Sequence, residues 1–303
     1  MSIKRALSGP CMGSRWSALF YADRVDQAAI QTALAAAVER VEAQMSNWRP
    51  TSDLMRLNAA PVGDWVAVPP GLSTVLVAGL QIGRDSDGAF DMGVGDLVAQ
   101  WGFGAQAGVP ALPRAQATAE TLALDVIAGQ ARKTAPLALD LSGIAKGYGV
   151  DQLAQVLDGF GIAAWLVGID GEMRARGVKP DGQQWLVALE QPVPGARAVR
   201  GVITLTDQAV ATTGDYRHYI ERDGKRLSHT MDARQGAPVE NSVASVTVLA
   251  PTCMQADGWA TALLVLGPTD GPVMARTQRL SALFVLHDGE GLVEIGVGPV
   301  FAG

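Results

Sequence analysis

A glycine-rich stretch in the middle of the chain carries an acid and a lysine. Residues 137–162 read LALDLSGIAKGYGVDQLAQVLDGFGI, in which Asp140 and Lys146 flank a Ser-Gly turn. The apolar run 137–141 predicts a strand, and residues 145–157 predict a helix. Backbone amides at a helix start favour phosphate, and a lysine there adds a full positive charge. The stretch is therefore a candidate anion site, although an ordinary strand-to-helix turn with a solvated lysine fits it equally well.

A second pair of reactive side chains lies in the segment MQADGWATAL. Asp257 and Thr261 are four residues apart and share one face of a predicted helix. A carboxylate and a hydroxyl are hard oxygen donors of the kind that Mg²⁺ or Ca²⁺ prefers, and a backbone carbonyl could complete such a site. As an isolated pair, however, an Asp bonded to a Thr on an ordinary helix face explains them better. The pair therefore indicates a metal site only if further ligand groups lie beside it.

The composition is that of a globular protein. Of 303 residues, 48% are hydrophobic and 18% are charged, which is enough to bury a large core. The net charge of −6 comes from 24 basic and 30 acidic residues scattered along the chain. A nucleic-acid partner is not expected, because its binding face would gather Lys and Arg. Two cysteines, Cys11 and Cys253, are too few for a disulfide framework and are interpreted as free thiols.

The first residues, MSIKRALSGPCMGSRW, contain no apolar run long enough for a signal peptide or a membrane anchor. The expected location is therefore the cytoplasm, or the periplasm if a leader has been removed. No membrane segment is expected.

Helical and strand patterns alternate along the chain. Helices are predicted at residues 26–46, from Pro69 and Pro70 to just before Phe90, and at 253–267. Short β-branched runs predict strands in AWLVGI, WLVALE, GVITLTDQAVAT, SVASVTVLA and SALFVLH. This pattern predicts an α+β fold, with one mixed domain over residues 1–303 in which helices flank sheets rich in antiparallel strands.

Six ordered segments resemble a known family. They are CMGSRW, MSNWRPTSDLMRLN, GAFDMGVGDLVAQWGFG, LDLSGIAKGYGVDQLAQVL, VATTGDYRHYIERDGKRLSHTMDARQGAP and VTVLAPTCMQADGWATALLVLG. In wording and order they look like the successive blocks of the ApbE family of flavin transferases. The resemblance spans about residues 11 to 267, which is nearly the whole chain.

The resemblance implies an activity. The ApbE-like enzyme would be a Mg²⁺-dependent FAD:protein FMN transferase that splits FAD at its pyrophosphate and releases AMP. FMN would be joined through a phosphoester to a Thr or Ser of an acceptor flavoprotein, in a short motif near Asp and Gly. By this analogy the metal would be held by Gly143, Asp257, Ala260 and Thr261. Such an ion would neutralise pyrophosphate oxygens.

The resemblance also implies the binding and catalytic residues. The FAD-binding positions would be Met12, Trp48, Ala89, Phe90, Asp91, Asp140, Lys146 and Met231. Met and Trp offer polarizable or aromatic surface to a ring system, while the acids can accept hydrogen bonds. His229 would take the proton of the acceptor hydroxyl or orient it, and Asp257 would be catalytic through the metal.

The chain departs from the family pattern at three places. The usual Asp-Pro-x-Thr-Gly is Asp232-Ala233-Arg234-Gln235-Gly236 here, which loses a rigid turn and a hydroxyl. Met92, Gly93 and Asp96 stand where Pro, Thr and Pro are frequent, and VGIDGEMRARG has Gly168 and Asp170 where an Asn and the first of two glycines are common. None of these changes removes an expected metal ligand.

Two other activities remain compatible with the same residues. The site could pass the phosphate to water, as an FAD pyrophosphatase giving FMN and AMP. Alternatively, the protein could bind FAD without catalysis, although the retained Asp257, Thr261 and Lys146 favour an enzyme.

Overall fold

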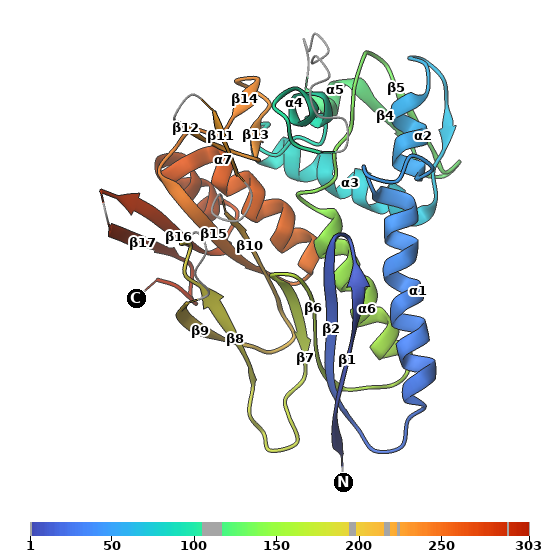
Figure 1. Cartoon of the computed structure of the whole chain (residues 1–303), viewed down its shortest axis with the longest axis vertical. Coiled ribbons are helices and arrows are strands. Elements are labelled where there is room, and N and C mark those ends of the chain that lie inside the picture. Colours follow the sequence, from blue (N-terminus) through green and yellow to red (C-terminus); the bar gives the residue numbers. More distant parts are fainter. Residues whose placement is uncertain are drawn as a thin grey trace.

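The computed structural model describes residues 2–104, 117–193, 198–214, 219–222, 225–289 and 291–302. Its centre is an eight-stranded sheet in which every pair of neighbouring strands is antiparallel (Figure 1). In spatial order the strands are β1 (Ile3–Cys11), β2 (Ser14–Ala22), β6 (Ala164–Ile169), β7 (Glu172–Arg176), β10 (Ala209–Gly214), β15 (Val243–Ala250), β16 (Ser281–Asp288) and β17 (Gly291–Val297).

Three helices cover one face of this sheet, namely α1 (Gln27–Met45), α6 (Ala145–Gly159) and α7 (Cys253–Thr277). Along β6, Trp165, Val167 and Ile169 point toward these helices, whereas Leu166 points to the opposite face. That opposite face is covered by the two-stranded sheet β8 (Trp185–Glu190) and β9 (Val199–Leu205). The alternation along the strand thus fills two separate apolar layers.

The remaining elements lie beyond one end of α1, and of these α3 packs against α7 (Figure 1). They are α2 (Asp53–Ala59), β3 (Val66–Ala67), α3 (Pro70–Asp85), α4 (Gly95–Gln100), α5 (Thr118–Thr121), β4 (Leu122–Asp125), β5 (Gln130–Lys133), β11 (Tyr219–Arg222), β12 (Lys225–Ser228), β13 (Met231–Asp232) and β14 (Ala237–Pro238). The largest apolar core joins these helices to the main sheet, since it includes Leu54, Leu76, Leu263 and Phe284.

Local sequence explains where the main helices begin and bend. The Asp26 side chain accepts a hydrogen bond from the Ala29 amide at the start of α1, and Pro70 occupies the first turn of α3. The long helix α7 is interrupted at Gly267, where the backbone is left-handed, with Pro268 following. Each predicted helix is therefore confirmed, and a second helical segment follows the predicted 253–267.

The α+β class and the antiparallel sheet are confirmed, but two strand predictions are wrong. The run GVITLTDQAVAT forms two strands, β9 and β10, because the chain turns at Asp207 with a left-handed backbone. Residues 137–141 belong to no helix or sheet. The side chain of Asn58 makes both hydrogen bonds of Leu139 instead, at 2.8 and 2.9 Å.

Both cysteines are buried free thiols, as predicted. Among the described residues, no helix is long and apolar enough to cross a membrane. The assignment of residues 1–303 to one domain stays a prediction.

Candidate active site

Helices α6 and α7 hold each other by reciprocal hydrogen bonds. Asp257 of α7 accepts from the amide of Gly147 in the first turn of α6, at 2.9 Å. Asp151 of α6 accepts from the amides of Cys253 and Met254 at the start of α7, both at 2.9 Å. Each helix start is thus capped by a carboxylate from the other helix, which places the glycine turn of residues 142–143 beside the middle of α7.

Glycines allow this close approach. A Cβ on Gly147 would overlap the backbone carbonyl of Cys253, and one on Gly143 would lie 3.0 Å from the hydroxyl oxygen of Thr261. Thr261 also lies 3.4 Å from the hydroxyl of Thr213 on β10. The structure therefore brings together three of the four residues expected to hold a metal, Gly143, Asp257 and Thr261, while Ala260 is buried beside Thr261 on α7.

The donors gathered here fit a hard divalent cation. They comprise a carboxylate, a hydroxyl and a backbone carbonyl. Burial, with help from the Glu172 carboxylate, raises the pKa of Asp257 to about 7, against the opposing effects of Lys146 and the Gly147 amide. A cation beside Asp257 would offset that cost. No cluster of three or more His, Cys, Asp or Glu residues that could hold a metal occurs in the described part of the chain, so a metal here depends on the hydroxyl and the carbonyl.

Lys146 lies in the first turn of α6 and contacts two acids. Its Nζ is 2.8 Å from Oε1 of Glu172 and 3.9 Å from a carboxylate oxygen of Asp170. Burial alone would lower the pKa of the lysine, but the carboxylates of Glu172, Asp257 and Asp170 outweigh it and raise that pKa above its ordinary value. Lys146 is therefore a permanent cation near neutral pH.

Asp140 lies at the edge of a cavity of about 250 Å³. Its carboxylate accepts from the Asn47 side chain at 2.6 Å and from the Ser142 amide at 2.7 Å. Asn58 and Phe103 line the same cavity. Asp140 thus fixes the glycine turn on one side and lines this cavity on the other.

His229 is connected to this cavity through Phe103. The two rings meet edge to face, with centroids 6.5 Å apart, and the imidazole is half-buried. Phe103 itself lines the cavity beside Asp140. His229 therefore lies next to the wall of the cavity.

The altered turn after His229 is closed by an ion pair. Arg234 donates to both carboxylate oxygens of Asp232, at 3.0 and 2.9 Å, and the amide of Gly236 donates to the Asp232 carbonyl. Burial works against ionisation, yet the hydrogen bonds of Arg234 prevail and hold the pKa of Asp232 below its ordinary value. The Asp232–Arg234 pair thus supplies an anchor to a turn that lacks the usual proline.

The other expected FAD positions have mixed surroundings. Ala89 and Phe90 are buried, and a Cβ on Gly143 would lie 3.4 Å from the Phe90 ring, so the segment backs the glycine turn. Asp91 accepts hydrogen bonds from the Thr118 amide and hydroxyl and from the Gly93 amide. These bonds anchor the loop between α3 and α4.

Met12, Trp48 and Met231 differ strongly in exposure. Met12 occupies the β1–β2 turn with a left-handed backbone, and its amide donates to Glu42. Trp48 is 71% exposed in the connection between α1 and α2, next to the residue that bonds Asp140. Met231 is buried in β13. Trp48 has surface to offer a ring system, whereas the Met231 side chain has little exposed surface.

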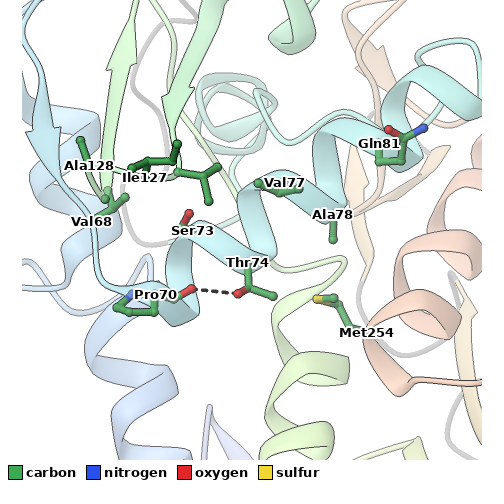
Figure 2. Close-up of a pocket in the computed structure, with 12 residues that line it drawn as sticks. Val68, Pro70, Ser73, Thr74, Val77, Ala78, Gln81, Ile127, Ala128 and Met254 are labelled. Atoms are coloured by element: carbon green, nitrogen blue, oxygen red, sulfur yellow. Dashed lines mark hydrogen bonds between the residues drawn. The ribbon is translucent and has the colours of Figure 1, made fainter.

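A larger groove lies away from these residues. It measures about 770 Å³ and runs between α3, the turn joining β4 and β5, and Met254 (Figure 2). Its lining is mostly apolar and includes Val77 and Ile127. None of the expected metal, FAD or catalytic residues lines it.

Comparison with known proteins identifies the relatives of the chain. The model of the ApbE family matches residues 12–284. The chain belongs to the ApbE family. An FAD:protein FMN transferase of Vibrio cholerae is 38% identical over 299 residues, covering 95% of this chain and 89% of that protein. One from Klebsiella pneumoniae is 35% identical over 303 residues, covering 96% and 86%.

Solved ApbE structures have the same fold. The flavin transferase ApbE from Vibrio cholerae superposes with a TM-score of 0.87 at 35% identity, covering 98% of both chains. The apo form of the Pseudomonas stutzeri flavinyl transferase ApbE gives 0.87 at 35% identity, covering 98% of this chain and 95% of that one. The ApbE protein of Thermotoga maritima, at 26% identity, gives 0.86, with 97% of each chain covered.

Sequence reasoning missed several residues of this ApbE site. Glu172 accepts from the Lys146 ammonium, and Asn47 donates to Asp140. Asp151 caps α7, and Asn58 bonds the backbone of Leu139. None of the four was singled out from the sequence. Glu172 carried little signal, since it begins the strand Glu-Met-Arg-Ala-Arg, in which charged residues are common. The asparagines carried none, because their partners lie 93 and 81 residues away in sequence.

Proposed function

We propose that this ApbE-family protein is a Mg²⁺-dependent FAD:protein FMN transferase. The observation that carries the proposal is the meeting of the α6 start with α7, which gathers Gly143, Asp257 and Thr261 beside Lys146. The names of the matched relatives support the reaction class. The α+β scaffold places a permanent cation and a set of hard oxygen donors together, as diphosphate chemistry requires.

In the proposed reaction, an acceptor Thr or Ser hydroxyl attacks the phosphorus on the flavin side of the FAD diphosphate. The new phosphoester bond joins FMN to the acceptor, the bond between the bridging oxygen and that phosphorus breaks, and AMP leaves. His229 takes the hydroxyl proton, and Lys146 neutralises diphosphate charge. Bound Mg²⁺ would be held by Asp257, Thr261 and the Gly143 carbonyl and would supply further neutralisation of the diphosphate oxygens.

The flavin and adenine ends need separate surfaces. We assign Met12, Trp48, Ala89, Phe90, Asp91, Asp140 and Met231 to FAD as a set, following the resemblance. The cavity beside Asp140 and the exposed indole of Trp48 support the assignment most directly. A cytoplasmic location and an acceptor motif with Thr or Ser near Asp and Gly stay predictions.

The test is mass spectrometry of the purified protein incubated with FAD, Mg²⁺ and a candidate acceptor domain. The expected result is a metal-dependent gain of one FMN mass on the acceptor with release of one AMP, abolished by EDTA. Asp257→Ala should abolish turnover, because it removes the only carboxylate of the proposed ligand set. Unchanged turnover of that variant would reject the metal assignment.

The same experiment separates the other two activities. Free FMN and AMP without a modified acceptor would identify an FAD pyrophosphatase. FAD that binds and stays intact with several acceptors and several divalent ions would identify a binding protein.

A further inference from the structure

Lys146 occupies an unfavourable position for a lysine. It lies in the first turn of α6, where the helix dipole repels a cation, and that turn contains no acidic residue. The lysine side chain is only 32% exposed. A partly buried cation at a helix start is destabilising unless other groups compensate, so the surrounding acids explain how it persists.

Glu172 supplies most of this compensation and is itself unusual. It is the first residue of β7, is 3% exposed, and accepts from the Lys146 ammonium at 2.8 Å through Oε1. Its second oxygen, Oε2, is buried and has no hydrogen-bond partner among the described residues. A buried acceptor without a donor costs free energy, so Glu172 is not placed here for stability alone.

A second acid approaches the same ammonium from the turn before β7. Asp170 lies 3.9 Å from Nζ and has a left-handed backbone, with φ of 55°. Aspartate adopts this conformation more readily than most residues, but glycine would adopt it without strain. The left-handed backbone at Asp170 is thus a local strain, and it brings another negative charge to Lys146.

A second ion pair between α6 and β7 gives a structural comparison for Lys146 and Glu172. Arg174 of β7 donates to Asp151 of α6 at 2.8 Å, so it joins the same two elements over the same distance as Lys146 and Glu172. Both oxygens of Asp151 are occupied, because they also cap α7. Glu172, by contrast, has one oxygen on the lysine and the other unpartnered.

We propose that Glu172 is a positioning residue that holds the Lys146 ammonium in place to meet the diphosphate of FAD. Lysine has a flexible four-carbon side chain, which loses conformational entropy when its ammonium is fixed. If the ammonium is already held before FAD binds, less entropy is lost when the reacting phosphates are positioned. The Asp170 carboxylate, 3.9 Å from the same ammonium, restrains it further. The proposal rests on the proposed function, since the diphosphate belongs to that reaction.

The first test measures the lysine itself and needs no FAD. The protein is treated briefly with acetic anhydride, and acetylation of Lys146 is compared with that of exposed lysines by peptide mass spectrometry. Glu172→Gln should increase Lys146 labelling several-fold, because the ammonium loses its principal partner. Glu172→Asp should give an intermediate rate, and the control Arg174→Lys should leave the rate unchanged.

The second test is kinetic. Glu172→Gln should lower kcat/KM for FAD by about 10²-fold, the loss that misplacement of a catalytic group can cause. A positioning role further requires non-additivity, so Glu172→Gln combined with Lys146→Met should be no worse than Lys146→Met alone. Arg174→Lys should keep the wild-type kinetics. Thermal unfolding of each variant identifies any that fails to fold, in which case Glu172→Asp replaces Glu172→Gln.

Three results would overturn the proposal: unchanged Lys146 labelling in Glu172→Gln, additive losses in the double variant, or an equal kinetic loss in Arg174→Lys. Failure of the proposed function gives a different pattern. The wild type would then transfer no FMN, while the labelling rates would still decide whether Glu172 holds Lys146.

Discussion

The Asp257 carboxylate accepts a hydrogen bond from a backbone amide and is also the proposed ligand of a cation. One of its oxygens caps α6 through the Gly147 amide, and its burial beside Glu172 makes ionisation costly. A residue kept only as a cap would be served as well by asparagine, which accepts the same hydrogen bond without a buried charge. Burial and the Glu172 carboxylate raise the pKa of Asp257, and an aspartate kept in spite of that cost supports the proposal that a cation binds at this carboxylate.

This pKa predicts how the metal-free protein responds to pH. The folded pKa of about 7 lies above the ordinary value of 3.8, so between these values the folded state holds a proton that the unfolded state has lost. Stability attributable to Asp257 is therefore greatest at low pH and falls as pH rises toward and through 7. In EDTA, the Tm of wild type minus that of Asp257→Asn should decrease from pH 5 to pH 8.

Adding Mg²⁺ at pH 8 should raise the Tm of the wild type again and leave the Tm of Asp257→Asn unchanged, because a ligand stabilises only the state that binds it. A difference in Tm that does not vary with pH would contradict the raised pKa. A Mg²⁺ response of equal size in both proteins would place the cation elsewhere.

His229 should act on the acceptor step rather than on FAD binding. It lies against Phe103 at the cavity wall. We expect His229→Ala to reduce FMN transfer by about 10²-fold or more, the usual contribution of a general base. The Kd for FAD, measured by flavin fluorescence, should change little. The exposed His287 gives a matched control, since His287→Ala should alter neither quantity, and a large loss of FAD affinity in His229→Ala would make it a binding residue instead.

The α6–α7 pair is the element that assembles the site. Two carboxylates bind backbone amides across the pair in opposite directions, and three glycines in α6 or just before it lie against neighbouring atoms. Small residues at such a crossing let backbones approach closely. Any change that separates the helices should therefore affect the metal donors and Lys146 together.

Two glycines of α6 give a matched test of this contact. A Cβ at Gly147 would overlap the Cys253 carbonyl, whereas one at Gly159 meets nothing within 4 Å. We expect Gly147→Ala to lower the free energy of unfolding by about 1–3 kcal/mol, as overpacking does. Gly159→Ala should be neutral or stabilising by up to about 1 kcal/mol, since alanine restricts the unfolded chain. Urea denaturation compares them, and equal effects would show that the helices can move apart freely.

Over the whole molecule, one core connects the site to the sheet. The largest apolar cluster takes residues from α1, α2, α3, α7, β15 and β16. The two sides of the site, α6 with α7 and the segment around Asp140 and Asn58, are therefore braced by the same packing. This continuity supports the prediction of one domain over residues 1–303.

A single domain should unfold in one step. We expect far-UV circular dichroism and tryptophan fluorescence to give coincident urea transitions, because Trp16, Trp165 and Trp259 report from different parts of the core. Two separated transitions would show that the α2–α5 region forms its own cooperative unit.

The sequence by itself predicted the features that depend on neighbours along the chain. Helix α1 begins at a capping aspartate and α3 at a proline, and both were located because caps and apolar periodicity are local signals. Membership of the ApbE family was also predicted from the sequence, because six ordered segments resemble the blocks of that family. Helical spacing alone placed Asp257 and Thr261 on one face of a helix, and both lie on α7.

Only the tertiary structure decided which distant residues meet. In the run 137–141, Leu139 bonds the side chain of Asn58 rather than a strand, because strand propensity does not specify a partner. Likewise, Asp257 meets Gly147 across 110 residues, and Lys146 meets Glu172 across 26. Long-range packing selects these pairs. From the sequence alone, Asp257 could lie on an ordinary helix face and Lys146 could be solvated, whereas packing brings both into one charged site.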